Sequence, residues 1–181
     1  MKKSMLALSM LALAVSANAN ARDGLYVSGA YSMMYHDAVF TSSNDVENGF
    51  AAAFGYDFPI GSFFVLGAEF EYKDLGSTTE KASSDSFKVS MSSVGVNLLP
   101  KVYFGDGFHL LGKLGYHKID ADIQTTILGQ ATTSASDSAT LIGVGLGYDF
   151  TKHIGLQTTY EIHNVASYNT ASANIAVKVS F

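Results

Sequence analysis

The sequence predicts an all-β protein: eight antiparallel strands that close into a transmembrane β-barrel, preceded by a cleaved signal peptide. Segments of about ten residues alternate apolar with small or polar side chains, and short turns alternate with long polar connections between them. Charged residues make up only 15% of the chain, compared with about 25% in soluble domains. We therefore expect lipid, rather than charged side chains, to cover much of the exterior.

Residues 1–21 have the organisation of a secretory signal peptide. Two lysines precede an apolar run over residues 5–15, and the small residues that follow offer cleavage after Ala19 or Ala21. The run is shorter than the roughly 20 residues that a membrane-spanning helix needs, which disfavours a retained anchor. We expect export from the cytoplasm and one domain over residues 22–181.

The composition excludes several functional classes. The chain has no cysteine, so it can form neither a disulfide framework nor a thiolate metal site. Its formal net charge is -5, and removal of the basic signal peptide makes it more acidic, which argues against a nucleic-acid partner. The five histidines show no paired metal-ligand spacing, and we expect no metal or other cofactor.

Eight segments carry the alternating pattern, and an even number is what bacterial single-chain barrels require. The expected strands cover residues 25–33, 50–58, 63–72, 87–98, 108–118, 142–150, 154–163 and 172–181.

Side-chain volume indicates which face of these strands points outward. One face carries large apolar groups, among them Phe54, Leu66, Leu146 and Tyr160, whereas the other is mostly Gly, Ala and Ser with a few charges. Eight strands enclose too little space for the large groups, so we expect them to face lipid around a tightly packed polar lumen. A soluble barrel with an apolar interior is the weaker alternative.

The segment over residues 87–98 departs from a single alternation. Its apolar residues change parity after Met91, since Val94 and the apolar residues that follow fall on the other face. A β-bulge near Ser92 and Ser93 would explain the change, and so would a wrong strand boundary.

The connections are asymmetric in length. Turn-like links cover residues 59–62, 105–107 and 151–153, whereas long polar stretches cover residues 36–48, 74–86 and 120–138. Barrels of the outer-membrane type have short periplasmic turns and longer extracellular loops. We therefore expect the three long stretches to be surface loops and to carry any contact with an external partner.

Several stretches resemble the small outer-membrane barrel families that include the transmembrane domain of outer-membrane protein A and the opacity-type surface barrels. They are residues 24–31, 66–72, 111–116 and 145–150, each a strand-Gly-aromatic pattern, together with the terminal strand. That strand ends on Phe181, as in the outer-membrane barrels that the barrel assembly machinery recognises.

The resemblance implies a bacterial outer-membrane location and a structural or surface-interaction role, such as adhesion or envelope integrity, through variable loops. The leading expectation is this role, toward a host or other surface ligand. A narrow pore for small solutes is the second hypothesis. Outer-membrane protein A carries a further peptidoglycan-binding domain after its barrel, and this sequence ends at Phe181, so a cell-wall anchoring role is not carried over.

Charged residues on the inward-facing parity are the first candidate site. Glu69, Glu71, Lys113 and Glu161 share that parity, and we expect Lys113 to pair with Glu69 or Glu161 because an isolated lumen charge is costly. In outer-membrane protein A an ionic cluster of this type is thought to gate a narrow passage. Glu69 and Lys113 match positions of that type, whereas Glu161 lies one inward-facing position away along its strand.

The histidines are weak catalytic candidates. His109, His117 and His163 are expected to point inward, and His163 and His117 have Ser167 and Asp120 nearby in sequence. Neither pair supplies a complete set of nucleophile, base and orienting group, so we expect no enzymatic activity. An outer-leaflet lipid-modifying enzyme, as exists among small barrels, is the distant alternative.

Three lysines near the long-loop rim, Lys73, Lys88 and Lys118, are expected to point outward. Such cations suit the phosphates of lipopolysaccharide, which with other outer-membrane lipid would be a partner. Lysines that only extend toward the membrane interface would show the same pattern.

Overall fold

The computed structural model describes residues 23–36, 46–82, 85–105, 107–126, 130–165 and 168–181. Residues 1–22, with the expected signal peptide and its cleavage sites, lie outside this range. Within the described ranges no helix is long and apolar enough to cross a membrane.

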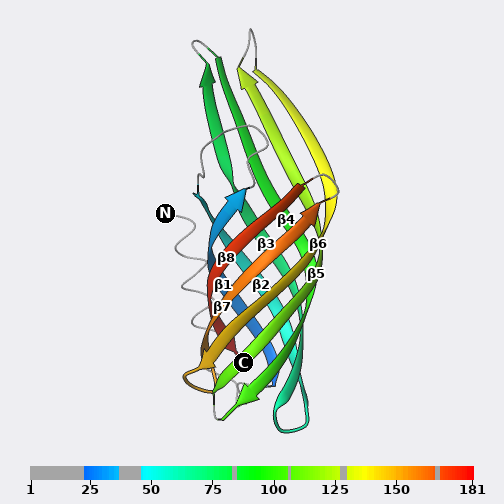
Figure 1. Cartoon of the computed structure of the whole chain (residues 1–181), viewed down its shortest axis with the longest axis vertical. Helices are drawn as coiled ribbons and strands as arrows, with labels where there is room; N and C mark the ends of the chain where they lie inside the picture. The colour runs from blue at the N-terminus through cyan, green and yellow to red at the C-terminus, as the bar shows by residue number, and fades with distance from the viewer. Residues whose placement is uncertain (1–22, 37–45, 83–84, 106, 127–129, 166–167) are drawn as a thin grey trace.

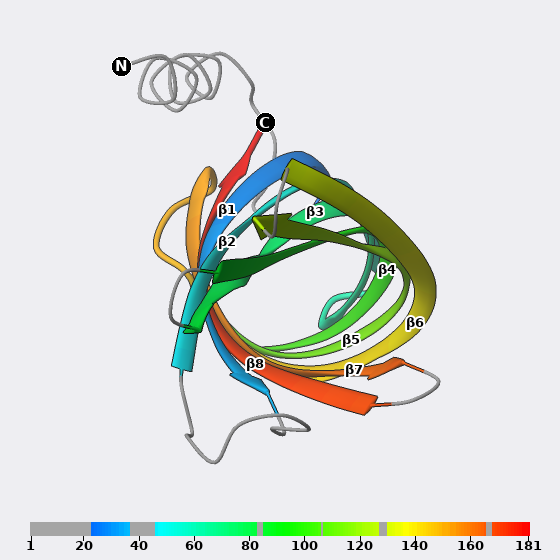
Figure 2. The same ribbon diagram turned by 90° about the horizontal axis from the view of Figure 1, so that it is seen from above.

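The described residues form eight strands in one closed antiparallel barrel (Figures 1 and 2). Each strand pairs with its neighbours in the sequence, and the first pairs with the last, so that Gly29 lies opposite both Ala52 and Val177. The all-β, eight-stranded prediction is therefore confirmed. The strands are β1 (Gly24–His36), β2 (Val46–Ile60), β3 (Phe64–Ala82), β4 (Asp85–Phe104), β5 (Phe108–Thr126), β6 (Gln130–Asp149), β7 (Ile154–Val165) and β8 (Tyr168–Ser180).

The large apolar side chains face outward, as their volume predicts. Phe54 is 54% exposed, Leu146 46% and Tyr160 50%, while Leu66 is half-buried. On the opposite face of the same strands lie side chains that are almost fully buried in the lumen, many of them polar or charged. The alternative with an apolar interior is therefore wrong for most of the barrel.

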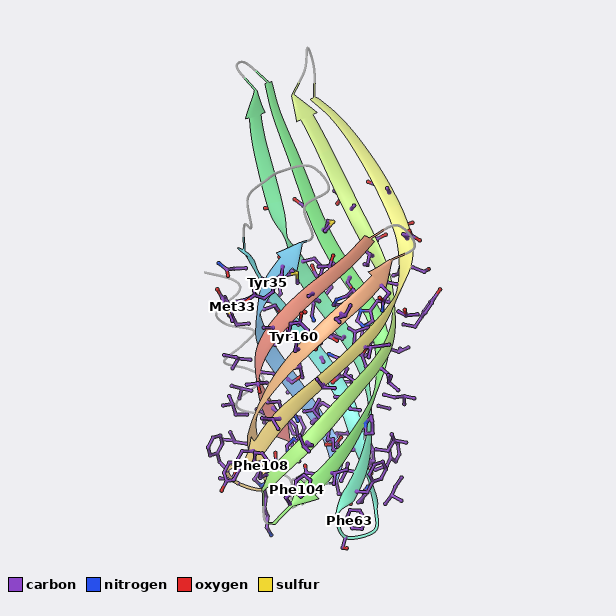
Figure 3. The ribbon with its side chains drawn as sticks, viewed as in Figure 1. Met33, Tyr35, Phe63, Phe104, Phe108 and Tyr160 are labelled. Carbon is purple, nitrogen blue, oxygen red and sulfur yellow. The ribbon has the colours of Figure 1, made fainter. Side chains whose placement is uncertain are left out.

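Exposed aromatic rings occur from the short-turn end up the wall of the barrel. Phe63, Phe104 and Phe108 lie at the end with the short turns, and Tyr35 and Tyr160 lie higher up the wall (Figure 3). The short turns themselves need little chain. Gly61 and Gly105 adopt positive φ of 80° and 72°, which glycine accommodates without strain.

The other end of the barrel differs from the prediction of loops. The β3–β4 pairing continues to Ala82 opposite Asp85, and the β5–β6 pairing continues to Thr126 opposite Gln130. Most of the predicted loops 74–86 and 120–138 are thus strands. Of the third predicted loop, 46–48 belongs to β2 and residues 37–45 lie outside the described residues.

These strands form a four-stranded sheet that stands beyond the rest of the barrel wall (Figure 1). We call it the extension, made of residues 75–82, 85–91, 120–126 and 130–138. Apolar alternation predicted only the part of the extension over residues 87–91. In residues 130–138 Ser, Thr and Ala occupy both faces, and residues 134–138 are exposed without interruption.

The parity change in the fourth predicted segment is not caused by a bulge in that segment. The β4–β5 register keeps one offset from Phe87 to Phe104, so β4 has no bulge at Ser92 and Ser93. The irregularity lies in β3, between Asp74 and Ser77. With this regular register Met91 faces inward, and its apolar side chain fits there because the lumen at that height is apolar.

Candidate functional site

The middle of the lumen holds the central ionic cluster, which we define as Glu69, Glu71, Lys73, Lys113 and Glu161. The alternation of β3, β5 and β7 directs these side chains inward. Lys113 Nζ lies 2.5 Å from Glu71 Oε2 and 3.2 Å from a carboxylate oxygen of both Glu69 and Glu161. Lys73 pairs with Glu161 and lies 3.6 Å from Glu71 Oε1. The structure thus brings together the four residues that sequence parity suggested.

Neutral donors complete the hydrogen bonding of the carboxylates. The hydroxyls of Tyr26 and Thr159 each donate to one of them, at 2.9 and 2.7 Å. Asn97 Nδ2 donates to both Glu69 and Glu71, at 3.1 and 2.6 Å. Buried charges are tolerable only when they are paired and hydrogen-bonded, so this network is what lets five charged side chains share the buried interior.

A lower ionic cluster lies nearer the short-turn end and consists of Asp57, Lys101 and Lys178. Lys101 Nζ donates to both Asp57 oxygens, at 2.7 and 2.8 Å, and Lys178 Nζ donates to Oδ2 at 2.9 Å. Both ammonium groups lie over the Tyr26 ring, 4.9 and 5.3 Å from its centre. Sequence reasoning missed this cluster although its inward parity was readable on β2, β4 and β8.

A third polar layer closes the short-turn end. Tyr103 donates to Asp149 Oδ2 at 2.8 Å and its ring packs on that of His109, with centroids 4.6 Å apart. Gln157 Nε2 lies 3.3 Å from His109 Nε2.

The opposite end of the lumen is closed by an apolar cap of Met34, Leu75, Ile119 and Ala139, against which Met91 packs. Between cap and lower layers, a cavity of about 30 Å³ remains beside the central ionic cluster. That is room for only about two or three water molecules. With the inward side chains almost fully buried, side chains fill most of the described lumen at these heights.

The three inward histidines lie where parity predicts, with His109 and His117 0% exposed and His163 1%. His117 Nδ1 lies 2.7 Å from Ser93 Oγ, and its Nε2 lies 2.8 Å from Asn97 Oδ1. This Ser-His-Asn array was not foreseen. Ser93 is only 1% exposed, which leaves its hydroxyl as a buried network member.

The suggested pair of His117 with Asp120 is not formed. His117 is buried in the lumen, whereas the Asp120 side chain is 47% exposed. Ser167 lies outside the described residues. His163 meets His117 edge-on, with centroids 5.8 Å apart, and within the described part of the chain neither of its ring nitrogens has a hydrogen-bond partner. No group of three potential metal ligands occurs there either.

The three lysines expected to face outward behave differently from one another. Lys73 was wrongly placed: it is 0% exposed and belongs to the central ionic cluster, because position 73 shares the parity of Glu69 and Glu71. Lys118 does face outward, with a side chain 61% exposed and 2.8 Å from Asp120. Nothing is described of the Lys88 side chain.

An outward belt of apolar and aromatic side chains, short turns at one end and a packed polar lumen together define a transmembrane barrel of the outer-membrane type. The sequence matches the family model of the outer membrane protein beta-barrel domain over residues 4–181. The chain belongs to this family and is an integral protein of the outer membrane.

Solved structures with the same fold agree. Ail, the attachment invasion locus protein of Yersinia pestis, solved with the heparin analogue sucrose octasulfate, superimposes with a TM-score of 0.62 at 15% identity, over 88% of this chain and 97% of that one. Neisserial surface protein A gives 0.53 at 16%, over 87% and 97%. The N-terminal barrel of Pseudomonas aeruginosa OprF gives 0.51 at 12%, over 88% and 99%. A search of curated proteins found no significant match.

Proposed function

We propose that this chain is a surface-interaction protein in which the barrel is a rigid base and the extension meets an external partner. The short turns of outer-membrane barrels face the periplasm, so the extension projects on the extracellular side. The observation that carries the proposal is the open backbone edge on each side of the extension.

These edges follow from the register. The β2–β3 pairing begins at Phe50 opposite Asp74, and the β6–β7 pairing begins at Ala139 opposite Val165. Among the described residues, Leu75–Ala82 of β3 and Gln130–Ser138 of β6 therefore have a strand neighbour on one side only. Unpaired N–H and C=O groups in such an edge can bind an extended segment of another polypeptide as an additional strand.

The β6 edge is the better candidate of the two. The β3 edge carries a bulge at Gly76, whose N–H donates to Asp74 Oδ1 at 3.0 Å, and it includes Glu80 and Lys81. Bulges and charges are features that protect edges from pairing. The stretch 130–138 has no proline and one charge, Asp137. We therefore infer that an extended polypeptide binds along β6.

The relatives support a role at the cell surface. Ail is named for attachment and invasion, and Neisserial surface protein A for its location. The sucrose octasulfate bound to Ail represents a different, polyanionic kind of ligand. For this chain, with a net charge of -5, a peptide strand fits better than a polyanion.

Adherence to an epithelial monolayer, by bacteria that display the chain, tests the proposal. Ser134→Lys with Ser136→Lys places two charges on the β6 edge. The matched control is Ser90→Lys with Ser92→Lys, which places the same two charges on the inner strand β4. The two pairs of sites lie in the same cross-strand rows. Asp122 of β5 pairs with both Ser90 and Ser134, and Asp120 pairs with both Ser92 and Ser136.

Only the edge variant should lose adherence. Deletion of residues 124–136 should abolish adherence as well, while the barrel remains folded and heat-modifiable in gels, since Ile119 opposite Asp137 can still close the hairpin. Equal loss in both lysine variants would indicate a charge effect and contradict strand addition. Unfolding of the deletion variant would show that residues 124–136 are structural.

Outward lysines add a second proposed contact, with lipopolysaccharide. Lys118 is exposed on β5 two residues beyond the exposed Tyr116. We propose that Lys118, with Lys88 on β4, meets the phosphates of that lipid. Loss of lipopolysaccharide co-purification in Lys118→Ala would support the contact; unchanged co-purification would leave Lys118 as an interfacial lysine without that role.

A further inference from the structure

The backbone groups of β6, the yellow strand at the side of the extension in Figure 1, have a defined direction. The strand pairs with β5 at one constant offset from Tyr148 to Gln130. Just below Tyr148, the Asp149 N–H donates to the Gly107 carbonyl oxygen on the β5 side, at 3.0 Å. In antiparallel pairing the N–H and C=O of one residue point to the same side, and successive residues alternate. Odd-numbered residues of β6 therefore direct these groups to β5, and even-numbered residues direct them away from it.

The even-numbered residues point to the open edge wherever β7 does not cover it. The pairing with β7 ends at Ala139, so Ser138 is the first such residue above it. Its N–H donates to Asp137 Oδ1 at 2.7 Å and is thus already satisfied. Among the described residues, the part of the edge that can accept a new strand therefore begins at Ser136 and continues through Ser134.

The sheet beside this edge is acidic. Residues 118–126 of β5 and 130–138 of β6 contain three aspartates and one lysine. The lysine, Lys118, is paired with Asp120. Asp122 and Asp137 are exposed, and neither forms a salt bridge with another residue in the part of the chain that the structure describes. Two negative charges are therefore left without a counter-charge close to the edge.

These two aspartates lie on opposite faces of the sheet. Asp137 pairs with Ile119, which faces the lumen, whereas Asp122 pairs with Ser134 on the outward face and accepts its hydroxyl at 2.7 Å. On an added antiparallel strand, the residue opposite Asp137 would form a pair without backbone hydrogen bonds, in which side chains come closest.

The outward face reaches a different position of the added strand. The residue opposite Ser134 would lie in the same cross-strand row as Asp122, two strand spacings of about 4.8 Å away. A long side chain can reach that carboxylate across the small Ser134. Since positions 134 and 137 of β6 are three residues apart, the two facing positions of the added strand are also three residues apart.

We propose that the polypeptide that binds along β6 is basic, with Lys or Arg at two positions three residues apart. One cation pairs with Asp137 on the lumen-facing side, and the other pairs with Asp122 on the outward side. The inference rests on the proposed strand addition and adds the chemistry of the partner to it. Opposite charges across a strand pair stabilise the pairing and like charges oppose it, so the edge disfavours an acidic segment. The same edge of a second copy fits poorly, because residues 130–138 contain no Lys or Arg.

Peptide binding to the barrel in lipid nanodiscs, which leave both of its ends accessible, tests the proposal. The probes are synthetic peptides of alternating threonine and valine, with either two lysines or two glutamates three residues apart. Fluorescence anisotropy at physiological salt measures their affinities. We expect the lysine peptide to bind the wild type about tenfold more tightly than the glutamate peptide.

Three variants separate the charge from the edge. Asp137→Asn should weaken binding of the lysine peptide about fourfold. Asp23→Asn is the matched control, because Asp23 is exposed and the change in net charge is the same, but it precedes Gly24 at the short-turn end. Ser134→Pro removes an edge-directed N–H without removing a hydrogen bond to β5, and should abolish binding of every peptide. Heat-modifiable gel mobility confirms that each variant is folded.

The outcomes distinguish this inference from the proposed function. Equal affinity for the lysine and glutamate peptides, or equal affinity of Asp137→Asn and Asp23→Asn for the lysine peptide, would overturn the basic partner. If Ser134→Pro still abolished that binding, strand addition itself would stand. Binding that Ser134→Pro leaves unchanged, or no binding of any peptide to the wild type, would contradict both.

Discussion

The ammonium group of Lys113 lies 2.5 Å from the carboxylate of Glu71 and thereby ties β5 to β3 across the lumen. Glu69 and Glu161 lie 3.2 Å from the same nitrogen. One cation thus serves three carboxylates contributed by two strands. The stability of the barrel should depend on this side chain more than on any surface lysine.

Lys113→Met keeps most of the side-chain volume and removes the charge. Three buried carboxylates would then face Lys73 alone, and breaking a buried pair costs about 3–5 kcal/mol. Urea unfolding in lipid vesicles, followed by heat-modifiable gel mobility, measures the loss. Lys118→Met removes an exposed pair and should cost less than ~1 kcal/mol. Equal losses in the two variants would show that the cluster contributes no special stability.

The lower ionic cluster should show coupling between its members. Asp57→Asn removes the carboxylate that Lys101 and Lys178 share and should destabilise the barrel strongly. Adding Lys178→Met should recover part of the loss. In a double-mutant cycle we expect a coupling of about 0.5–3 kcal/mol between Asp57 and Lys178. Strictly additive losses would contradict the pairing.

The packing of the lumen against the wall can be tested with two glycines in strand interiors. A Cβ on Gly95 would lie 2.4 Å from the His117 ring and 2.5 Å from the Tyr116 carbonyl oxygen, whereas one on Gly29 would meet nothing within 4 Å. Gly95→Ala should therefore cost about 1–3 kcal/mol of unfolding free energy, as overpacking does. Gly29→Ala should be neutral or slightly stabilising. Similar urea midpoints for both variants would argue against the close contact with His117.

The filled lumen predicts the outcome of conductance measurements for the narrow-pore hypothesis. Wild type, Lys113→Ala and Met34→Ala should each give no stable single-channel current in planar bilayers. The apolar cap and the two ionic clusters obstruct the lumen at different heights, so one truncation removes only one barrier. A stable current in the wild type that Lys113→Ala alters would contradict the closed lumen and favour a gated pore.

Most of the barrel could be predicted from the sequence because the alternation of apolar and polar residues is a local pattern. Alternation over a few residues fixes the face of each side chain, which suffices to place Phe54 outside and Glu69, Lys113 and Glu161 inside. The parity of Glu69 also places Lys73 inside, so the expectation that Lys73 faces outward together with Lys118 was wrong. Alternation does not reveal which inward groups meet, and the lower ionic cluster joins residues as far apart as Asp57 and Lys178.

The extension could not be predicted for a different reason. Residues 134–138 are exposed on both faces of the strand, so this segment has no apolar face that alternation could reveal, and Ser and Thr suit loops equally well. Their strand character comes from pairing with β5, for example Asp122 opposite Ser134. Met91 also departs from the expected pattern. It faces the lumen although it is apolar, because an apolar cap fills the lumen at that height in place of the polar side chains found lower down.

Cysteine labelling on intact cells tests the central claim most directly, since the chain has no cysteine of its own. Single cysteines at Ser136 on the β6 edge, at Leu146 in the apolar belt and at Thr151 in a short turn are treated with a membrane-impermeant maleimide. We predict rapid labelling at position 136, none at 151 until the outer membrane is permeabilised, and none at 146 in either case. Labelling at 151 but not at 136 on intact cells would contradict both the orientation of the barrel and the exposed extension on which the proposed function depends.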